Sequence, residues 1–319
     1  MVKQISNWFI LVLGVSIIPL PAAEFNRVGT TGFVFLEIPA STRYAGMGET
    51  GITLTDVYSD GLFINPALIT LGDKKYAVSM NHARWFVETT HQSAGFTVQI
   101  PTIGTLGIQI IYFDFGDIEK TRNPNPAEYG SYIDLGSYSA DALALGISFA
   151  RNLTDQFAFG FTTKYVSEAI DIYKTDNLIW DLGFLYQTGF HTLRIGATLQ
   201  NFGLDAKYIT DKFKMPQLLK IGLSAEIWGS REQSSYVTFL LEAAHPNDID
   251  EHIQIGMEGV LSRIIVLRAG YKLGYDEENF TFGLGIRFMN RGFAAKFDLA
   301  YIQHQHLEGV IRYGLSMEF

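Results

Sequence analysis

The chain has 319 residues, with 24 Lys and Arg against 33 Asp and Glu, a formal net charge of −9 and no cysteine. The absence of cysteine excludes a disulfide framework, cysteine-ligated zinc, iron–sulfur clusters and thiol catalysis, and the acidic balance argues against a nucleic-acid partner. Charged residues make up only 18% and there are 31 glycines, which is unusual for a soluble domain. Because no apolar run is long enough to cross a bilayer as a helix, any spanning segments must be strands.

The first 23 residues have the pattern of a secretory signal peptide. They hold a single charge, Lys3, then an apolar run from Trp8 to Ile18, and they end in Ala22 and Ala23. A short basic region, an apolar core and small residues at the end are typical of a signal peptide, and the run is shorter than a membrane helix needs. The alternative is a buried N-terminal helix. We expect residues 1–23 to be removed and the chain to leave the cytoplasm.

From about residue 75 to the end, the sequence alternates with a period of two, which is typical of strands with two different environments. The final strand shows the apolar face most clearly: Ile311, Tyr313, Leu315, Met317 and Phe319. The segments run for roughly 9–12 residues, which suits a tilted membrane strand better than a strand of a soluble sandwich. Charged side chains lie on the opposite face of these predicted strands. These features predict an all-β fold, a transmembrane antiparallel β-barrel over residues 75–319, with its charged face toward the lumen.

We predict about fourteen strands, an even number that fits a single-chain outer-membrane barrel. Short connections alternate with longer, more polar ones, which places the C-terminus in the periplasm. The predicted strands cover residues 75–82, 86–100, 104–114, 138–151, 156–168, 177–188, 191–201, 217–228, 235–245, 252–261, 264–274, 279–289, 292–302 and 309–319. The charged side chains predicted to face the lumen include Lys220, Glu226, Arg268, Arg287, Lys296, Asp298, Arg312 and Glu318.

Residues 24–74 do not alternate and contain seven glycines and two prolines. A barrel of this size has a lumen too wide for short side chains to fill. We therefore expect residues 24–74 to form a plug inside the barrel or across its mouth.

The sequence offers no catalytic motif of the hydrolase, zinc-protease or nucleotide-binding kinds. Neither Ser224 nor Ser316 has an obvious histidine partner in its own or the next strand, and the pair His304 and His306 is too small a ligand set for a metal site. We expect no enzymatic activity, no metal and no cofactor.

Two motifs in the N-terminal segment resemble those of a known family. The first spans residues 43–48 and reads Arg-Tyr-Ala-Gly-Met-Gly, and the second spans residues 65–68 and reads Asn-Pro-Ala-Leu. Together with the leader, the barrel length and the terminal Phe319, they resemble the PorV/PorQ family of outer-membrane barrels, which is similar to the FadL-type transporters. Leu68 is a departure, because many relatives have glycine there. The terminal Phe319 is similar to the C-terminal insertion signal of bacterial outer-membrane barrels.

The resemblance implies a FadL-like barrel of fourteen strands in the bacterial outer membrane. It singles out the plug motif Arg43, Gly46, Met47, Gly48, Asn65, Pro66 and Ala67. These residues are expected either to shape the plug, which we favour, or to gate a ligand. We expect Arg43 to pair with a lumen carboxylate such as Glu226, Asp298 or Glu318, and Gly46 and Gly48 to allow close backbone approach.

Four functions are compatible with the sequence. The first is a non-catalytic component of type IX protein secretion, which the resemblance implies and which binds cargo C-terminal signal domains, the translocon or both. The second is a FadL-like transporter of hydrophobic small molecules; the others are a structural barrel and a secreted soluble β-protein. The expected partners of the first are outer-membrane lipid and lipopolysaccharide, the barrel-assembly machinery, and the type IX translocon with its cargo, but no nucleic acid.

Overall fold

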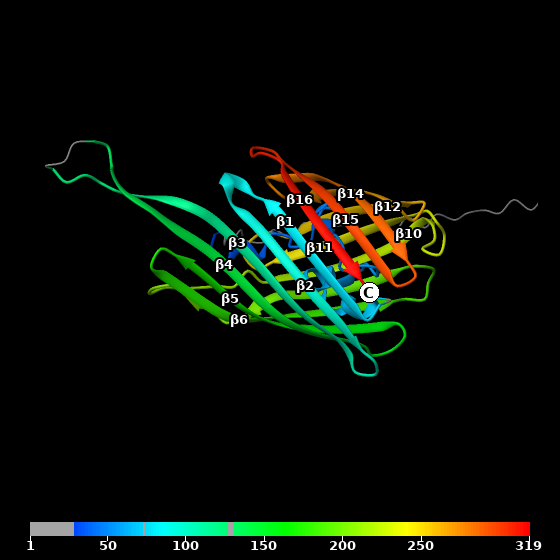
Figure 1. Ribbon diagram of the computed structural model, residues 1–319. Helices are drawn as coiled ribbons and strands as arrows, with labels where there is room; N and C mark the ends of the chain where they lie inside the picture. Colours follow the sequence, from blue (N-terminus) through cyan, green and yellow to red (C-terminus); the bar gives the residue numbers. More distant parts are fainter. Residues whose placement is uncertain (1–28, 73, 127–129) are drawn as a thin grey trace, which may run out of the picture.

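The structure is a computed structural model that describes residues 29–72, 74–126 and 130–319. The expected signal peptide, residues 1–23, lies outside the described residues. Within them, fourteen antiparallel strands close into one barrel, and β1 (Tyr76–Arg84) pairs with both β2 and β16 (Val310–Glu318) (Figure 1). The prediction of a fourteen-stranded antiparallel barrel is therefore confirmed.

Apart from the closure of β1 on β16, the wall strands pair in chain order, and among the described residues only β7 and β10 have other strands between them in the chain. A two-stranded ribbon, β8 (Ala206–Lys207) and β9 (Lys212–Phe213), lies in that connection. The other wall strands are β2 (Thr90–Ile100), β3 (Gly104–Arg122), β4 (Ile133–Asn152), β5 (Phe157–Ile170), β6 (Tyr173–Gln187), β7 (Arg194–Gly203), β10 (Leu218–Gly229), β11 (Tyr236–Pro246), β12 (His252–Leu261), β13 (Ile265–Leu273), β14 (Glu278–Asn290) and β15 (Phe293–His304).

Burial alternates along the strands because successive side chains point to opposite faces. In β16, the outward residues Ile311, Tyr313 and Leu315 are exposed, whereas Arg312 and Ser316 between them are buried inside. Large apolar side chains cover the outer wall, as a lipid-facing surface requires. Among the described residues, no helix has the length and apolar character needed to cross a bilayer.

The two ends of the barrel differ. We call the end with the short connections and the C-terminus the turn end, and the opposite end the loop end. The chain closes at the turn end, where Tyr76 and Phe319 exchange two backbone hydrogen bonds of 2.9 Å and their rings lie 5.7 Å apart. By the rule that short turns face the periplasm, the turn end is periplasmic.

The predicted strands were too short in two places: β3 continues beyond its predicted end, and β4 begins before its predicted start. The segment 115–137, predicted as a long loop, mostly continues both strands, and the β3–β4 hairpin projects far beyond the rest of the barrel (Figure 1). Residues 117–121 include Asp117, Glu119 and Lys120, so both faces of this stretch are polar and the hydrophobic alternation stops. Two register shifts, near Asp114 and Glu119, mark the change.

Two further boundaries were wrong. Residues 86–88, predicted as strand, form a short 3-10 helix, η4 (Phe86–Glu88), in which Val87 and Glu88 have positive φ. The predicted loop 169–176 is a tight hairpin that turns at Asp171 and Ile172, with Asp171 at φ 53°. A non-glycine residue in the left-handed region carries little sequence signal, so neither turn was visible from composition.

Residues 29–72, which we call the inner segment, run inside the barrel. The segment contains η1 (Val34–Leu36), α1 (Thr42–Ala45), η2 (Tyr58–Asp60), α2 (Gly61–Ile64) and η3 (Pro66–Leu71). It contacts opposite sides of the wall. The Thr42 N–H donates to Asn81 on β1, the Gly51 N–H donates to Glu242 on β11, and Gln200 on β7 donates to the Ile64 carbonyl.

Glycines on the inner wall let the backbone of the inner segment approach closely. A Cβ at Gly270 would lie 2.0 Å from the Gly48 nitrogen, and a Cβ at Gly160 would lie 2.3 Å from the Ala67 nitrogen. Real Cβ atoms never come that close to backbone, so only glycine fits at these positions.

Candidate functional site

A network of buried charges fills the turn-end half of the lumen, and Arg43 of α1 lies at its centre. The Arg43 guanidinium donates to both oxygens of Glu258 on β12, at 2.8 and 2.7 Å, and also to Asp56 of the inner segment. The bidentate geometry is the strongest form of this ion pair. Arg43 is 2% exposed and Glu258 is 0% exposed, so water cannot replace either partner.

Other strands complete the network around the same two carboxylates. Arg268 on β13 donates to Glu258 at 2.7 Å and to Asp298 on β15 at 2.7 Å. Arg287 on β14 lies 3.2 Å from Glu258 and 3.0 Å from Asp56. Charges buried away from water are tolerable only when they are paired in this way.

Asp56 joins the inner segment to the turn-end wall. Besides Arg43, its carboxylate lies 3.1 Å from Arg231 in the β10–β11 turn and 3.4 Å from Lys296 on β15. Burial alone would raise the pKa of Asp56, but the surrounding cations hold that pKa well below its usual range. Asp56 therefore stays ionised, and it anchors the inner segment to three sides of the wall.

The charges predicted for the lumen are placed as follows. Arg268, Arg287, Lys296 and Asp298 join the Arg43 network, and Glu226 joins it through Arg231 at 2.6 Å while also pairing with Arg194 at 2.8 Å.

The remaining three predicted charges lie elsewhere on the inner wall. Lys220 is in the loop-end half, where its ammonium donates to the Tyr44 hydroxyl at 2.5 Å and to the Glu49 carbonyl at 2.9 Å. Arg312 is fully buried and donates to the Pro39 carbonyl and to His91. Glu318 is buried at the turn end, beside Gly72.

The expected partners of Arg43 were wrong: the structure pairs it with Glu258 and Asp56 in place of Glu226, Asp298 or Glu318. All the carboxylates on the inner wall share one face of the strand pattern, so the sequence alone does not distinguish them. The partner depends on which side of the lumen α1 contacts.

The other motif residues lie where the inner segment contacts the wall. Gly46 packs on Gly283, where a Cβ would come within 3.1 Å of its Cα, and Gly48 has φ +67° and donates to Thr281 at 2.7 Å. Met47 is fully buried.

The second motif forms its own contacts. Asn65 donates to the Ile52 and Phe184 carbonyls at 2.7 and 3.1 Å, and its side-chain oxygen accepts from the Ala67 N–H at 3.0 Å. Pro66 begins η3, the position where a missing N–H costs nothing.

Sequence reasoning missed several residues that build the site. Asp56, Glu258 and Arg231 belong to the network, and Glu242 accepts from the Gly51 and Ile52 N–H groups at 2.5 and 2.9 Å. The sequence signal was available for the strand residues, because Glu242 and Glu258 have the inward parity. It was absent for Asp56 and Arg231, which lie outside the strands.

A cavity of about 790 Å³ occupies the loop-end half of the lumen. One side is apolar and is lined by Phe33 and Phe35 of the inner segment and by Ile111, Phe113 and Phe115 of β3. The other side is polar and carries Glu37, Glu49, His252, Lys272, Tyr275 and Glu278. Its volume is in the range that holds small organic ligands.

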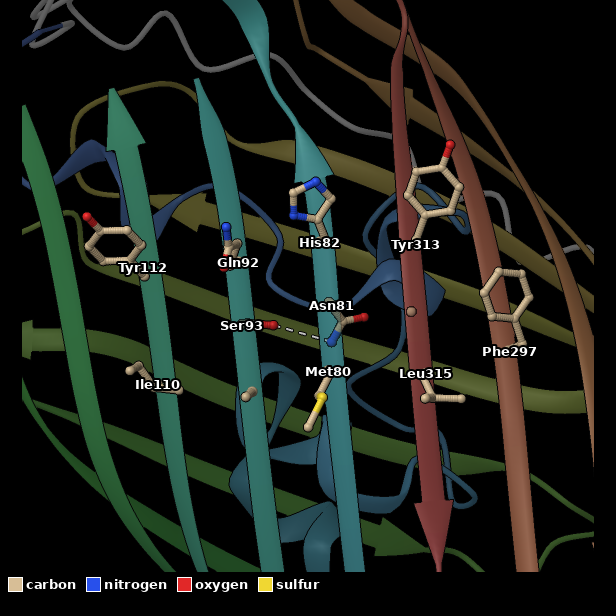
Figure 2. Close-up of a pocket in the computed structure, with 12 residues that line it drawn as sticks. Met80, Asn81, His82, Gln92, Ser93, Ile110, Tyr112, Phe297, Tyr313 and Leu315 are labelled. Carbon is tan, nitrogen blue, oxygen red and sulfur yellow. Dashed lines mark hydrogen bonds between the residues drawn. The ribbon is translucent and has the colours of Figure 1, made fainter. Parts of the chain in front are cut away.

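A shallow groove of about 430 Å³ lies on the outer wall, beside the closure of β1 with β16 (Figure 2). A polar row crosses it, formed by the register neighbours Tyr112, Gln92, His82 and Tyr313. His82 and Gln92 are exposed on this face, whereas Asn81 and Ser93 point inward and hydrogen-bond each other at 3.3 Å (Figure 2). Polar side chains on a wall that faces lipid are costly and usually functional.

Among the described residues, no group of three or more histidine, cysteine, aspartate or glutamate side chains could hold a metal ion. A ring nitrogen of His304 lies 3.3 Å from a carboxylate oxygen of Glu278, and a ring nitrogen of His306 lies 2.9 Å from a carboxylate oxygen of Glu277. The two histidines therefore have separate partners.

Comparisons with solved structures show the fold. The toluene transporter TodX of Pseudomonas putida is 12% identical, with a TM-score of 0.58, covering 86% of this chain and 96% of TodX. The monoaromatic hydrocarbon channel CymD is 12% identical, with a TM-score of 0.58 and coverages of 90% and 98%. A FadL homologue of Pseudomonas aeruginosa is 10% identical, with a TM-score of 0.53 and coverages of 87% and 97%. No curated protein matches the chain.

The family model described as type IX secretion system protein PorV matches residues 21–179, about half of the chain. The match includes both N-terminal motifs, the first five wall strands and the first half of β6. With the FadL-like barrel, it indicates a non-enzymatic protein of the bacterial outer membrane. The chain belongs to the PorV family of outer-membrane β-barrels.

Proposed function

We propose that this protein is a non-catalytic component of type IX secretion that binds the C-terminal signal domains of cargo proteins, the translocon, or both. The observation that carries the proposal is the family match over the inner segment and the first strands. The paired charges that join the inner segment to the turn-end wall support it, since a barrel with such contacts across its lumen is better suited to binding a partner than to transporting a solute.

Contact with the translocon is supported by the outer-wall groove. His82 and Gln92 are polar side chains facing outward next to Met80 and Leu315. A partner barrel or membrane-embedded strand that hydrogen-bonds these groups would compensate for removing them from water. The groove is thus our candidate face for a partner in the plane of the membrane.

The test is co-purification of the tagged full chain from outer membranes solubilised in a mild detergent. Cargo carrying its C-terminal signal domain should co-purify, and the same cargo without that domain should not. Replacing His82→Leu and Gln92→Leu together should reduce recovery of the translocon, whereas Phe288→Leu, an outward substitution on β14 away from the groove, should leave it unchanged. Recovery of neither cargo nor translocon with the unmodified chain would refute the proposal.

A second candidate is a FadL-like transporter of hydrophobic small molecules, favoured by the apolar side of the loop-end cavity. TodX and CymD, which share the fold, are described as a toluene transporter and a monoaromatic hydrocarbon channel. Transport requires a path past the Arg43 network. Liposomes containing the protein that fail to take up monoaromatic hydrocarbons faster than empty liposomes would eliminate this candidate.

A further inference from the structure

The loop-end cavity differs from a simple apolar pocket because its wall carries an excess of negative charge. Five carboxyl groups line it, against two lysines, so three of the carboxyl groups have no lysine partner in the wall. The lining charges are Glu37, Glu49, Glu168, Asp181 and Glu278, with Lys164 and Lys272. Three further charged residues bond to lining residues: Asp248 accepts from Thr31, Arg312 donates to the Pro39 carbonyl, and Lys220 donates to Tyr44 and to the Glu49 carbonyl.

The lysines are already committed to carboxylates. Lys164 lies 2.8 Å from Asp181, and Lys272 is paired with both Glu49 and Glu278. Neither ammonium is therefore available to the anionic head of a ligand without breaking a buried pair.

Two carboxylates remain available. Among the described residues, the Glu37 carboxylate has no ion-pair or hydrogen-bond partner, and the Glu168 carboxylate accepts only from the Tyr208 hydroxyl, at 3.4 Å. Burial inside the barrel, together with Asp248 and Glu49, raises the pKa of Glu37 to about 7. A cation near Glu37 would interact favourably with these carboxylates and stabilise the charged form of Glu37.

A buried histidine adds an independent sign of a ligand. His252 lines the cavity and is 5% exposed, and both of its ring nitrogens lack a hydrogen-bond partner among the described residues. Its ring stacks on Tyr275 with the centroids 4.1 Å apart. Buried polar atoms are nearly always paired, so the two nitrogens mark a place where a polar group of a ligand fits.

We propose that the cavity binds an amphiphile with an apolar or aromatic body and a cationic head. The body packs on Phe33, Phe35 and Phe113, and the head lies toward Glu37 and His252. An anionic head, such as the carboxylate of a free fatty acid, is disfavoured because it would meet like charges in a site shielded from water. The inference extends the second candidate function to a ligand class and does not depend on cargo binding.

The experiment uses Trp85, which lines the cavity, as the reporter. The full protein is reconstituted in phosphatidylcholine nanodiscs and titrated with bromododecylammonium, whose head carries N–H donors, or with bromododecanoate. The bromine of either probe quenches nearby tryptophan. Subtracting the signal of Trp85→Phe isolates quenching in the cavity from quenching of the other tryptophans. We expect saturable quenching, with the ammonium binding on the order of tenfold more tightly than the carboxylate.

Variants test the origin of the preference. Glu37→Gln combined with Glu168→Gln should remove most of the preference, whereas Glu88→Gln, an exposed glutamate outside the cavity, should keep it. A carboxylate probe that binds as tightly as the ammonium overturns the ligand class but leaves the transporter candidate intact. No saturable quenching by either probe overturns the site itself.

Discussion

At the scale of single residues, the inner charges decide how the lumen is closed. Arg43 contributes four hydrogen bonds, two to the fully buried Glu258 and two to Asp56, whose side chain is partly exposed. Removing one member of a buried pair leaves the others unpaired, which costs more than the pair itself contributes.

We predict that Arg43→Met detaches the turn-end part of the inner segment, at a cost of about 3–5 kcal/mol. The wall strands keep their own hydrogen bonds, so the barrel should remain folded. The measurement is conductance in planar bilayers, where the variant should show open-channel events that the unmodified protein lacks. Arg84→Met, at an exposed arginine on β1, is the matched control and should stay closed. An Arg43→Met protein as silent as the control would contradict the role of the network.

Glu37 makes ligand binding depend on pH. Its pKa is raised to about 7, so the side chain loses its proton as the pH rises through that value. Binding of the ammonium probe should therefore strengthen from mildly acidic to mildly alkaline pH, since the carboxylate becomes charged. Titrations of Glu37→Gln should show much weaker pH dependence. A wild-type affinity that falls as the pH rises would be inconsistent with Glu37 facing the head group.

The sequence predicted which charges face inward but not how they pair. Inward parity follows from a period of two, and it holds for Lys220, Arg268, Arg312 and the others. Pairing depends on contacts between residues far apart in the chain; Arg43 and Glu258 are separated by 215 residues. Asp56 carries no periodic signal, because it lies in the irregular inner segment.

At the scale of elements, the inner wall is matched to the inner segment by its glycines. Gly270 on β13 faces Gly48, and Gly160 on β5 faces Ala67, so each motif of the inner segment lies against a wall position without a side chain. This arrangement explains why glycines alternate with larger residues in these strands. The alternation of glycines with larger residues could be seen in the sequence, but which part of the inner segment packs against each glycine could not.

We predict that Gly270→Val expels α1 and the turn after it from the wall, because a side chain there would overlap the Gly48 and Met47 backbone. Limited trypsin digestion should then cleave after Arg43, which is protected in the unmodified protein. Gly259→Val on β12 is the matched control, since a Cβ there meets no atom closer than 3.9 Å. Equal protection of Arg43 in both variants would show that the contact does not hold the segment.

The closure of β1 on β16 ends at Phe319, which we also propose as the insertion signal. Its backbone exchanges two hydrogen bonds with Tyr76, and the rings pack together. Deleting Phe319 should lower the fraction of heat-modifiable, folded protein in the outer membrane, whereas Phe288→Ala, a lipid-facing aromatic of β14, should have little effect. Full insertion of the deletion variant would contradict this role.

At the scale of the whole molecule, the lumen has two different halves. The turn-end half is filled by the inner segment and its paired charges, and the loop-end half holds an amphipathic cavity. The barrel and its strand number followed from periodicity and strand length. The extension of β3 and β4 could not be predicted in this way. Strands that pair outside the membrane do not need an apolar face, so their sequence does not alternate between apolar and polar residues.

The most direct test of the proposed role is deletion of the gene in its own host, followed by quantitative proteomics of the cell surface and medium. We predict that proteins bearing type IX C-terminal signal domains are lost from the surface and accumulate in the periplasm, and that the unmodified gene restores them. If these cargo proteins still reach the surface at wild-type levels in the deletion strain, the proposed role in type IX secretion is wrong.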